Sequence, residues 1–278
     1  MWRLVRQDSR VEATARLVQA ALDAGITLFD TADIYGFDGQ QGFGAAEQLL
    51  GDVLRADPTL RARMVISTKG GIRPPLPYDQ SPEWLNEAID ASLRRLSVDT
   101  IDLWHIHRPD ILTHPQEVAA MLDAAVAAGK IRALAVSNFT THQTAALDHF
   151  LNNKLVATQP EISPLRIACF ENGEMDQAMM MGITPLAWSP LGGGRLIEPT
   201  TPRELAVAAA LDEFAASKGI SRSVAADSWL MAHPAGVVPI IGSQEAERIR
   251  EAANAIDIRW SRQEWYGVFV AARGERLP

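Results

Sequence analysis

Short apolar stretches alternate with longer stretches of helical periodicity along almost the whole chain. The short stretches are often β-branched, and the longer ones repeat apolar residues at helical spacing. Repeated β and α units predict a parallel sheet covered by helices, because a parallel strand is reached only through a crossover connection. No linker or change in composition interrupts this pattern, so we expect residues 1–278 to form a single domain.

The alternation predicts seven strands and ten helices. We expect the strands at Leu28–Asp30, Met64–Lys69, Ile101–His107, Ile131–Ser137, Ala157–Glu161, Thr184–Trp188 and Val238–Ile241. We expect the helices at Val11–Ala24, Ala45–Leu54, Pro82–Leu96, Pro115–Ala128, His142–Leu151, Gly173–Met181, Pro202–Ser217, Ser223–Ala232, Glu245–Ala255 and Arg262–Arg273. Ser81 precedes a proline at a first helical position, and Thr201 and Ser261 each begin a capping-box pattern.

A closed barrel is favoured over a doubly wound sheet for two reasons. No G-x-G-x-x-G follows an early strand, and polar residues gather at the C-terminal ends of successive strands. The predicted fold class is therefore α/β, a (β/α)8 TIM barrel. Such a barrel needs eight strands, and Trp2-Arg3-Leu4 matches only the tail of an additional one. We therefore expect most of the first strand to be missing at the N-terminus, either through truncation or as a natural short start.

Composition excludes several classes of protein. The net charge is -8 without a block of one sign, which disfavours a nucleic-acid surface. The single cysteine, Cys169, excludes an internal disulfide framework and fits a reducing cytoplasm. No apolar run approaches the ~18 residues of a membrane span. We expect a cytoplasmic protein with no membrane or nucleic-acid partner, and nothing in the sequence demands more than a monomer.

Four polar residues at the expected strand ends suit proton donation: Asp30, Tyr35, Lys69 and His107. A tyrosine is a poor acid at neutral pH, and we expect the ammonium of Lys69 to lower the pKa of the phenol. Asp30 would hold the lysine in place and keep it charged. His107 would orient or polarise a substrate carbonyl.

The motifs around these residues resemble those of the aldo-keto reductase family. The resemblance is carried, in family order, by the segment from Gly25 to Gly36, by Ser67-Thr68-Lys69, by the segment from Asp102 to Asp110, by the segment from Gly129 to Phe139, and by the segment from Trp188 to Gly194. It is strongest to the bacterial YdhF-like oxidoreductases, because of His107-Arg108-Pro109-Asp110 and the triple glycine. It implies reduction of an aldehyde or ketone to an alcohol by hydride transfer from NADPH, with Tyr35 as the general acid.

The resemblance also implies the cofactor site. Ser137, Asn138 and Gln159 would bind the nicotinamide carboxamide, Trp188 would stack on the ring, and Ser189, Leu191 and Gly192 would wrap the pyrophosphate. Gly242, Ser243, Arg248 and Glu251 lie where the family binds the adenosine end. Because a guanidinium can bind a 2′-phosphate bidentately, Arg248 favours NADP over NAD.

Two other functions compete with the reductase. A catalytically weak NADP(H)-binding sensor or scaffold would keep the nucleotide site without turnover. The His105-x-His107 pair would suit a metal hydrolase, but such a site needs further ligands from other strands, so we expect no metal. The identity of the carbonyl substrate does not follow from the sequence, because specificity in this fold lies in loops.

Overall fold

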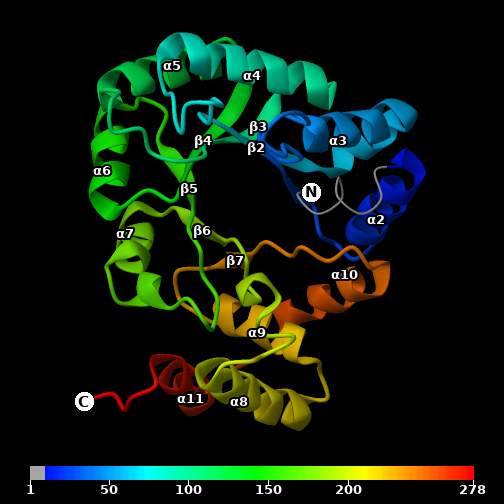
Figure 1. Ribbon diagram of the computed structural model, residues 1–278, viewed down its shortest axis with the longest axis vertical. Helices are drawn as coiled ribbons and strands as arrows, with labels where there is room; N and C mark the ends of the chain where they lie inside the picture. The colour runs from blue at the N-terminus through cyan, green and yellow to red at the C-terminus, as the bar shows by residue number, and fades with distance from the viewer. Residues whose placement is uncertain (1–9) are drawn as a thin grey trace. The chain divides into compact units, whose positions relative to one another are not determined.

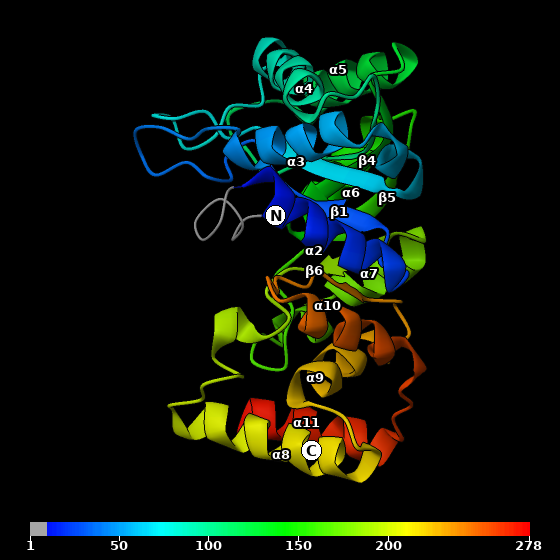
Figure 2. The ribbon, with the colours of Figure 1, turned by 90° about the vertical axis from the view of Figure 1, so that its right-hand side faces the viewer.

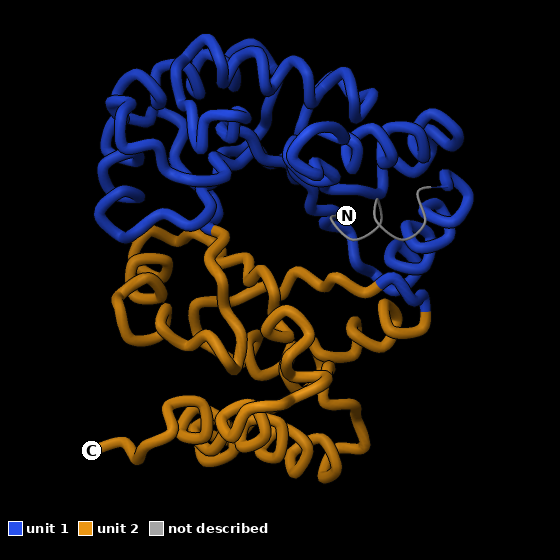
Figure 3. Tube along the Cα trace, viewed as in Figure 1, with its two compact units in different colours: residues 1–158, 244–246 blue, residues 159–243, 247–278 orange. Residues whose placement is uncertain are grey.

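The computed structural model describes residues 10–278 (Figures 1 and 2). The chain divides into two compact units, coloured separately in Figure 3. Within the described chain, unit 1 comprises residues 10–158 and 244–246, and unit 2 comprises residues 159–243 and 247–278. Trp2-Arg3-Leu4, the expected tail of a first strand, lies outside the described residues.

Unit 1 alternates strands and helices up to β5, whose last residue opens unit 2. Its strands are β1 (Leu28–Asp30), β2 (Val65–Gly70), β3 (Ile101–Ile106), β4 (Ile131–Ser137) and β5 (Leu155–Gln159). Its helices are α2 (Val11–Asp23), α3 (Ala45–Ala56), α4 (Pro82–Leu96), α5 (Pro115–Ala127) and α6 (Thr141–Phe150), with a 3-10 turn η1 at Pro58–Arg63.

Strands β1 to β4 are parallel and lie side by side in chain order. Asp30 pairs in register with Ser67, and Lys69 pairs with His105. Because side chains alternate along a strand, Ser67, Lys69 and His105 share one face of the sheet. The opposite face is turned toward the helices, since Thr68 donates a hydrogen bond to Glu47 of α3. Figure 1 shows helices α3 to α6 along this covered face.

Two glycines allow close packing on the helical face. A Cβ on Gly51 of α3 would lie 1.9 Å from the carbonyl oxygen of Arg95 in α4. A Cβ on Gly70 of β2 would lie 2.6 Å from Cζ2 of Trp104. The absence of these side chains lets α3 approach α4 and lets the buried indole of Trp104 cover the end of β2.

Unit 2 is mainly helical. Its strands are β6 (Thr184–Ala187) and β7 (Val238–Pro239), which are parallel neighbours. Its helices are α7 (Glu174–Met181), α8 (Pro202–Lys218), α9 (Arg222–Met231), α10 (Ala246–Ala253, entered from unit 1) and α11 (Arg262–Arg273). The 3-10 turns are η2 (Ala168–Phe170), η3 (Gly192–Gly194) and η4 (Asn254–Asp257).

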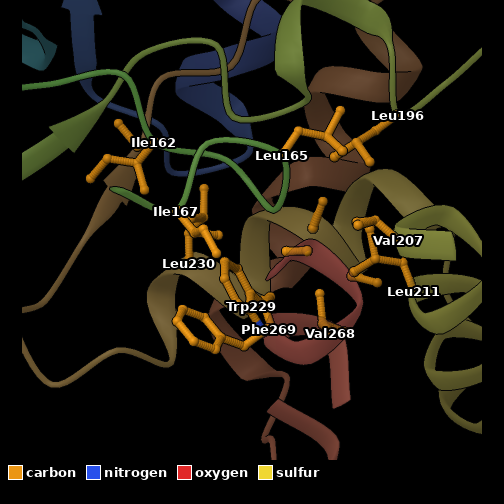
Figure 4. Close-up of a cluster of buried hydrophobic side chains, with 14 of the residues drawn as sticks. Ile162, Leu165, Ile167, Leu196, Val207, Leu211, Trp229, Leu230, Val268 and Phe269 are labelled. Carbon is orange, nitrogen blue, oxygen red and sulfur yellow. The ribbon is translucent and has the colours of Figure 1, made fainter. Parts of the chain in front are cut away.

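The core of unit 2 is a cluster of buried side chains from α8, α9 and α11 and the segment before η2 (Figure 4). At its centre Trp229 and Trp265 stack, with ring centroids 4.7 Å apart and planes 10° from parallel. Each indole N–H donates to the backbone carbonyl of the other residue at 3.0 Å. This reciprocal pairing ties α9 to α11 and gives both indole N–H groups a hydrogen-bond partner.

All seven expected strands and all ten expected helices are present, with shifted ends. The exceptions are β1, β4, α4 and α11, which have the expected bounds. The capping boxes at Thr201 and Ser261 are formed, and the Ser81 side chain caps α4. Among residues 10–278, no helix is both long enough and apolar enough to span a membrane.

Candidate active site

The expected catalytic residues lie at the C-terminal ends of adjacent strands of unit 1. Asp30 ends β1, Lys69 is the penultimate residue of β2, and His107 directly follows β3. Tyr35 lies in the turn after β1, where the Ala46 N–H donates to its backbone carbonyl at 3.1 Å. The parallel order of the strands brings these residues of unit 1 together.

Lys69 is fully buried, and its ammonium group has three acceptors for its three protons. Nζ donates to Oδ2 of Asp30 at 2.6 Å, to the carbonyl oxygen of Thr31 at 2.8 Å and to Oη of Tyr35 at 3.4 Å. Burial alone would lower the pKa of Lys69, but the charge of Asp30 and the contacts with Tyr35 raise it above its ordinary value. The ammonium therefore stays charged, and the tyrosine is its longest contact.

The direction of the Lys69–Tyr35 contact decides where the phenol proton points. An ammonium can only donate, so Oη of Tyr35 accepts from Lys69. The hydroxyl proton of Tyr35 must then be directed away from Lys69. This geometry suits a group that gives a proton to a third molecule while its developing phenolate is stabilised by a fixed cation.

Lys69 acts to lower the pKa of Tyr35, as expected, but the net pKa of the phenol is not lowered. Burial raises the pKa of the phenol above its ordinary value, and the charge and hydrogen bond of Lys69 only partly oppose that effect. The physical reason is that removal from water penalises the phenolate more than one ammonium stabilises it. Tyr35 is therefore a neutral phenol that carries its proton throughout the physiological pH range.

His107 stands against Tyr35, with the two ring centroids 5.8 Å apart and the planes at 81°. Burial, followed by the charges of Lys69 and Arg108, holds the pKa of His107 well below its ordinary value. The imidazole is therefore neutral at pH 7 and keeps one N–H donor and one acceptor. A neutral donor beside the phenol can hydrogen-bond a carbonyl oxygen without competing as an acid.

Ser137 and Asn138 lie next to His107 in unit 1. Ser137 ends β4 and is almost fully buried. Asn138 adopts a positive φ of 59°, which directs its Nδ2 to Oγ of Ser137 at 2.8 Å and to the carbonyl oxygen of His107 at 3.3 Å. A positive φ is uncommon for a residue other than glycine. Here it keeps the side chains of Ser137 and Asn138, both of which can hydrogen-bond an amide, at one edge of the sheet.

The remaining expected cofactor residues lie in unit 2. Gln159 ends β5 and is buried, and Trp188 directly follows β6. The loop that follows has positive φ at Ser189 and at all three glycines of η3. A Cβ on Gly193 or Gly194 would meet no described atom within 4 Å, so space lies beside this backbone. Such left-handed turns are typical of backbone concavities that bind anions.

The expected adenosine-end residues follow β7. Gly242 is exposed, Ser243 is half-buried, and Arg248 and Glu251 lie three residues apart on α10. Residues at that spacing share one side of a helix. A guanidinium can bind a phosphate, and a carboxylate can accept a hydrogen bond from a hydroxyl.

No group of three or more histidine, cysteine, aspartate or glutamate side chains within residues 10–278 is placed to hold a metal ion. His105 lies on β3, and His107 directly follows the end of that strand. Oγ of Ser67 lies 3.0 Å from Nε2 of His105, so this histidine has a hydrogen-bond partner of its own.

The sequence analysis did not predict a role for Ser67, nor the buried carboxyl groups of Glu47 and Asp33. Ser67 lies two residues before Lys69, and this spacing on a strand was the available signal. On the helical face, Arg95 donates to Glu47 at 2.7 Å, and Asp33 is buried nearby. Burial, and then the charge of Glu47, raises the pKa of Asp33 well above its ordinary value.

Comparison with known proteins identifies the family of this chain. Residues 1–268 match the profile of the Aldo/keto reductase family. A 6-dehydroglucose reductase of Novosphingobium aromaticivorans is 68% identical over 278 residues, covering 100% of this chain and 91% of that protein. A 6-dehydroglucose reductase of Agrobacterium fabrum is 37% identical over 287 residues, covering 100% and 94%. Oxidoreductase YdhF of Escherichia coli is 35% identical over 286 residues, covering 100% and 93%.

A solved structure shows the same fold. The thermostable aldo-keto reductase Tm1743, crystallised with the inhibitor epalrestat, superposes with a TM-score of 0.80 at 24% identity. The match covers 95% of this chain and 89% of that one. The fold class expected from the sequence is thereby confirmed. The chain belongs to the aldo-keto reductase family of oxidoreductases and to its (β/α)8 TIM-barrel fold class.

Proposed function

We propose that this protein reduces an aldehyde to an alcohol with NADPH, and that Tyr35 is the general acid. The observation that carries this proposal is the contact of Tyr35 with a saturated, buried ammonium, which leaves the phenol proton for a substrate. Bound NADPH supplies the hydride that adds to the carbonyl carbon. Everything else in the step is proton placement and charge stabilisation by this chain.

Each of the four polar residues has one task in the proposed step. Tyr35 gives its proton to the carbonyl oxygen as the alcohol forms. Lys69, 3.4 Å from Oη, stabilises the phenolate that remains. Asp30 holds Lys69 in place at 2.6 Å. Neutral His107 donates a hydrogen bond to the same carbonyl oxygen and so fixes its approach to Tyr35.

The cofactor assignment is supported by the chemistry of the expected residues. Ser137, Asn138 and Gln159 offer neutral donors and acceptors for the carboxamide, and Trp188 offers a flat surface for the ring. The positive-φ loop from Ser189 to Gly194 leaves room for a diphosphate. Arg248 supports NADPH as the preferred form, with NADH as the alternative.

We propose 6-dehydroglucose as the substrate. Two relatives that match this whole chain are named 6-dehydroglucose reductases, one of them at 68% identity. 6-Dehydroglucose carries an aldehyde, and Tyr35 can give its proton to the oxygen of such a group. The products would be glucose and oxidised cofactor.

A tyrosine exchange tests the function. Tyr35→Phe removes the proton donor and should lower kcat/KM for 6-dehydroglucose by on the order of 10²–10⁴-fold. The dissociation constant for NADPH should stay within about twofold, since no step of binding uses the phenol proton. The rate is followed by loss of NADPH absorbance, and binding by quenching of tryptophan fluorescence.

Tyr266→Phe is the matched control, because Tyr266 is exposed on α11 of unit 2, whereas Asp30, Tyr35, Lys69 and His107 belong to unit 1. It should retain the full rate. A substrate-dependent rate that survived Tyr35→Phe would exclude Tyr35 as the acid. Tight NADPH binding by the unmodified chain without turnover of 6-dehydroglucose or of simple aldehydes would instead support the sensor or scaffold function.

We further propose a cytoplasmic monomer with one domain. One family profile spans residues 1–268, which supports a single domain. Burial raises the pKa of the Cys169 thiol, and its Sγ donates to Glu174, so the only cysteine of the chain is unreactive. Sedimentation of the purified chain tests the oligomeric state.

A further inference from the structure

Behind the Asp30–Lys69 pair lie two buried polar side chains for which the proposed mechanism has no use. Oγ of Ser67 is 3.1 Å from Oδ1 of Asp30 and 3.0 Å from Nε2 of His105. Both side chains are fully buried. They come from adjacent strands, β2 and β3, on the face that carries Lys69. A line of hydrogen bonds therefore runs from His105 through Ser67 and Asp30 to Lys69 and Tyr35.

The number of protons that each group carries decides which group donates in these hydrogen bonds. Asp30 is 2.6 Å from an ammonium and is a carboxylate, which only accepts. The single proton of Ser67 must therefore point to Oδ1 of Asp30. The oxygen of Ser67 then accepts from His105, so the neutral imidazole carries its proton on Nε2.

Burial also keeps the ring of His105 neutral. Burial, and then the charge of Lys69, lowers the pKa of His105 to about 3, so the ring stays neutral. The donor and acceptor roles of His105, Ser67 and Asp30 therefore stay the same at any ordinary pH.

We propose that His105 and Ser67 are positioning residues for the proton donor. They fix one oxygen of Asp30 so that the other holds the Lys69 ammonium within reach of Tyr35. The inference rests on the proposed function, because it takes Tyr35 as the acid. Since Tyr35 is the longest of the three contacts of Lys69, a small displacement of Asp30 acts first on the Lys69–Tyr35 distance.

Loss of Ser67 should change the rate and its pH dependence. Ser67→Ala removes a donor to a charged group and should lower kcat about 10-fold with little change in KM. With Lys69 less firmly held, burial dominates the pKa of Tyr35, so the alkaline limb of the kcat/KM profile should move to higher pH. The other groups that act on Tyr35 and Lys69 are Asp30, His105, His107 and Arg108, with Asp33 beyond Lys69. All of them are retained in this variant.

A pair of similar-sized residues at position 105 separates positioning from packing. His105→Gln keeps an N–H donor near the place of Nε2 and should retain most of the activity. His105→Leu fills the same space without a donor and should lower kcat and move the alkaline limb as Ser67→Ala does. NADPH affinity and the unfolding midpoint are measured for each variant, so that a misfolded protein is recognised.

The outcomes are distinguishable. Unchanged kcat and pH profiles in Ser67→Ala and His105→Leu, with Tyr35→Phe inactive, would overturn the inference and leave the function intact. Equal losses in His105→Gln and His105→Leu with no movement of the alkaline limb would also overturn it. Should a residue 105 variant fail to fold, Ser67→Ala and Ser67→Cys carry the same test. An active Tyr35→Phe would overturn the proposed function itself.

Discussion

The acid chemistry of Tyr35 depends on a balance between burial and one neighbouring ammonium. Burial raises the pKa of the phenol, and Lys69 counteracts only part of that rise. Lys69 therefore matters most after the proton has left, when a phenolate in a poorly hydrated place needs a cation. His107, kept neutral by the same burial, can donate a hydrogen bond but cannot replace Tyr35 as the acid.

Two arginines of α10 provide a residue-scale prediction about the cofactor. Arg248→Ala should weaken NADPH binding by about 10-fold while NADH binding changes little, because only NADPH carries a 2′-phosphate for the guanidinium. Arg250→Ala is the control, since Arg250 is exposed on the same helix and pairs with Glu247. Tryptophan quenching gives both dissociation constants. Equal weakening of NADPH and NADH in Arg248→Ala would remove the 2′-phosphate role from this residue.

At the scale of elements, replacing each of two helical glycines with alanine should change the free energy of unfolding in opposite directions. Gly51→Ala should lower the free energy of unfolding by about 1–3 kcal/mol, because its Cβ would overlap the Arg95 carbonyl oxygen. Gly267→Ala should raise it by about 0.5–1 kcal/mol, because this α11 glycine has no described atom within 4 Å of its Cβ position. Urea denaturation measures both. A Gly51→Ala variant at least as stable as the unmodified protein would contradict the tight α3–α4 contact.

Periodicity predicted the type and order of the elements better than their ends. We expected a strand at Ala157–Glu161, but β5 runs Leu155–Gln159. Pro160 has no N–H for the ladder and follows the last strand residue. β7 is likewise limited to Val238–Pro239 rather than reaching Ile241.

The site was predicted from strand ends, but its hydrogen bonds were not. The pairing of Lys69 with His105 depends on the register between β2 and β3, which one sequence does not specify. The role of Ser67 follows only from that register. The sign of the Tyr35 pKa shift needed the depth of burial, which residue identity alone does not provide.

At the scale of the whole molecule, one buried carboxyl should make a contribution to the free energy of unfolding that falls as the pH rises through the acid range. Asp227 is buried in α9, and burial raises its pKa to about 7. Below the unfolded value of about 3.9 both states are protonated, and above it the unfolded chain releases the proton while the folded chain keeps it. The stability loss therefore accumulates up to about pH 7 and is constant beyond it.

Asp227→Asn tests that dependence. The exchange should raise the free energy of unfolding by on the order of 2–4 kcal/mol at about pH 8 and have little effect at about pH 4. Asp257→Asn, at an exposed position of η4, should change neither value. Urea denaturation at both pH values gives the comparison. A gain that did not depend on pH would show that Asp227 is not a buried acid.

The stacked pair of Trp229 and Trp265 makes part of this molecule visible on its own. Two indoles held 4.7 Å apart and nearly parallel couple their strong far-ultraviolet transitions, which adds a pair of circular-dichroism bands of opposite sign to the helix signal. Both rings belong to unit 2, so this pair of bands reports the opening of that unit alone. The helix signal, in contrast, sums helices of both units. Comparison of the two signals during denaturation would show whether the units melt together or in sequence.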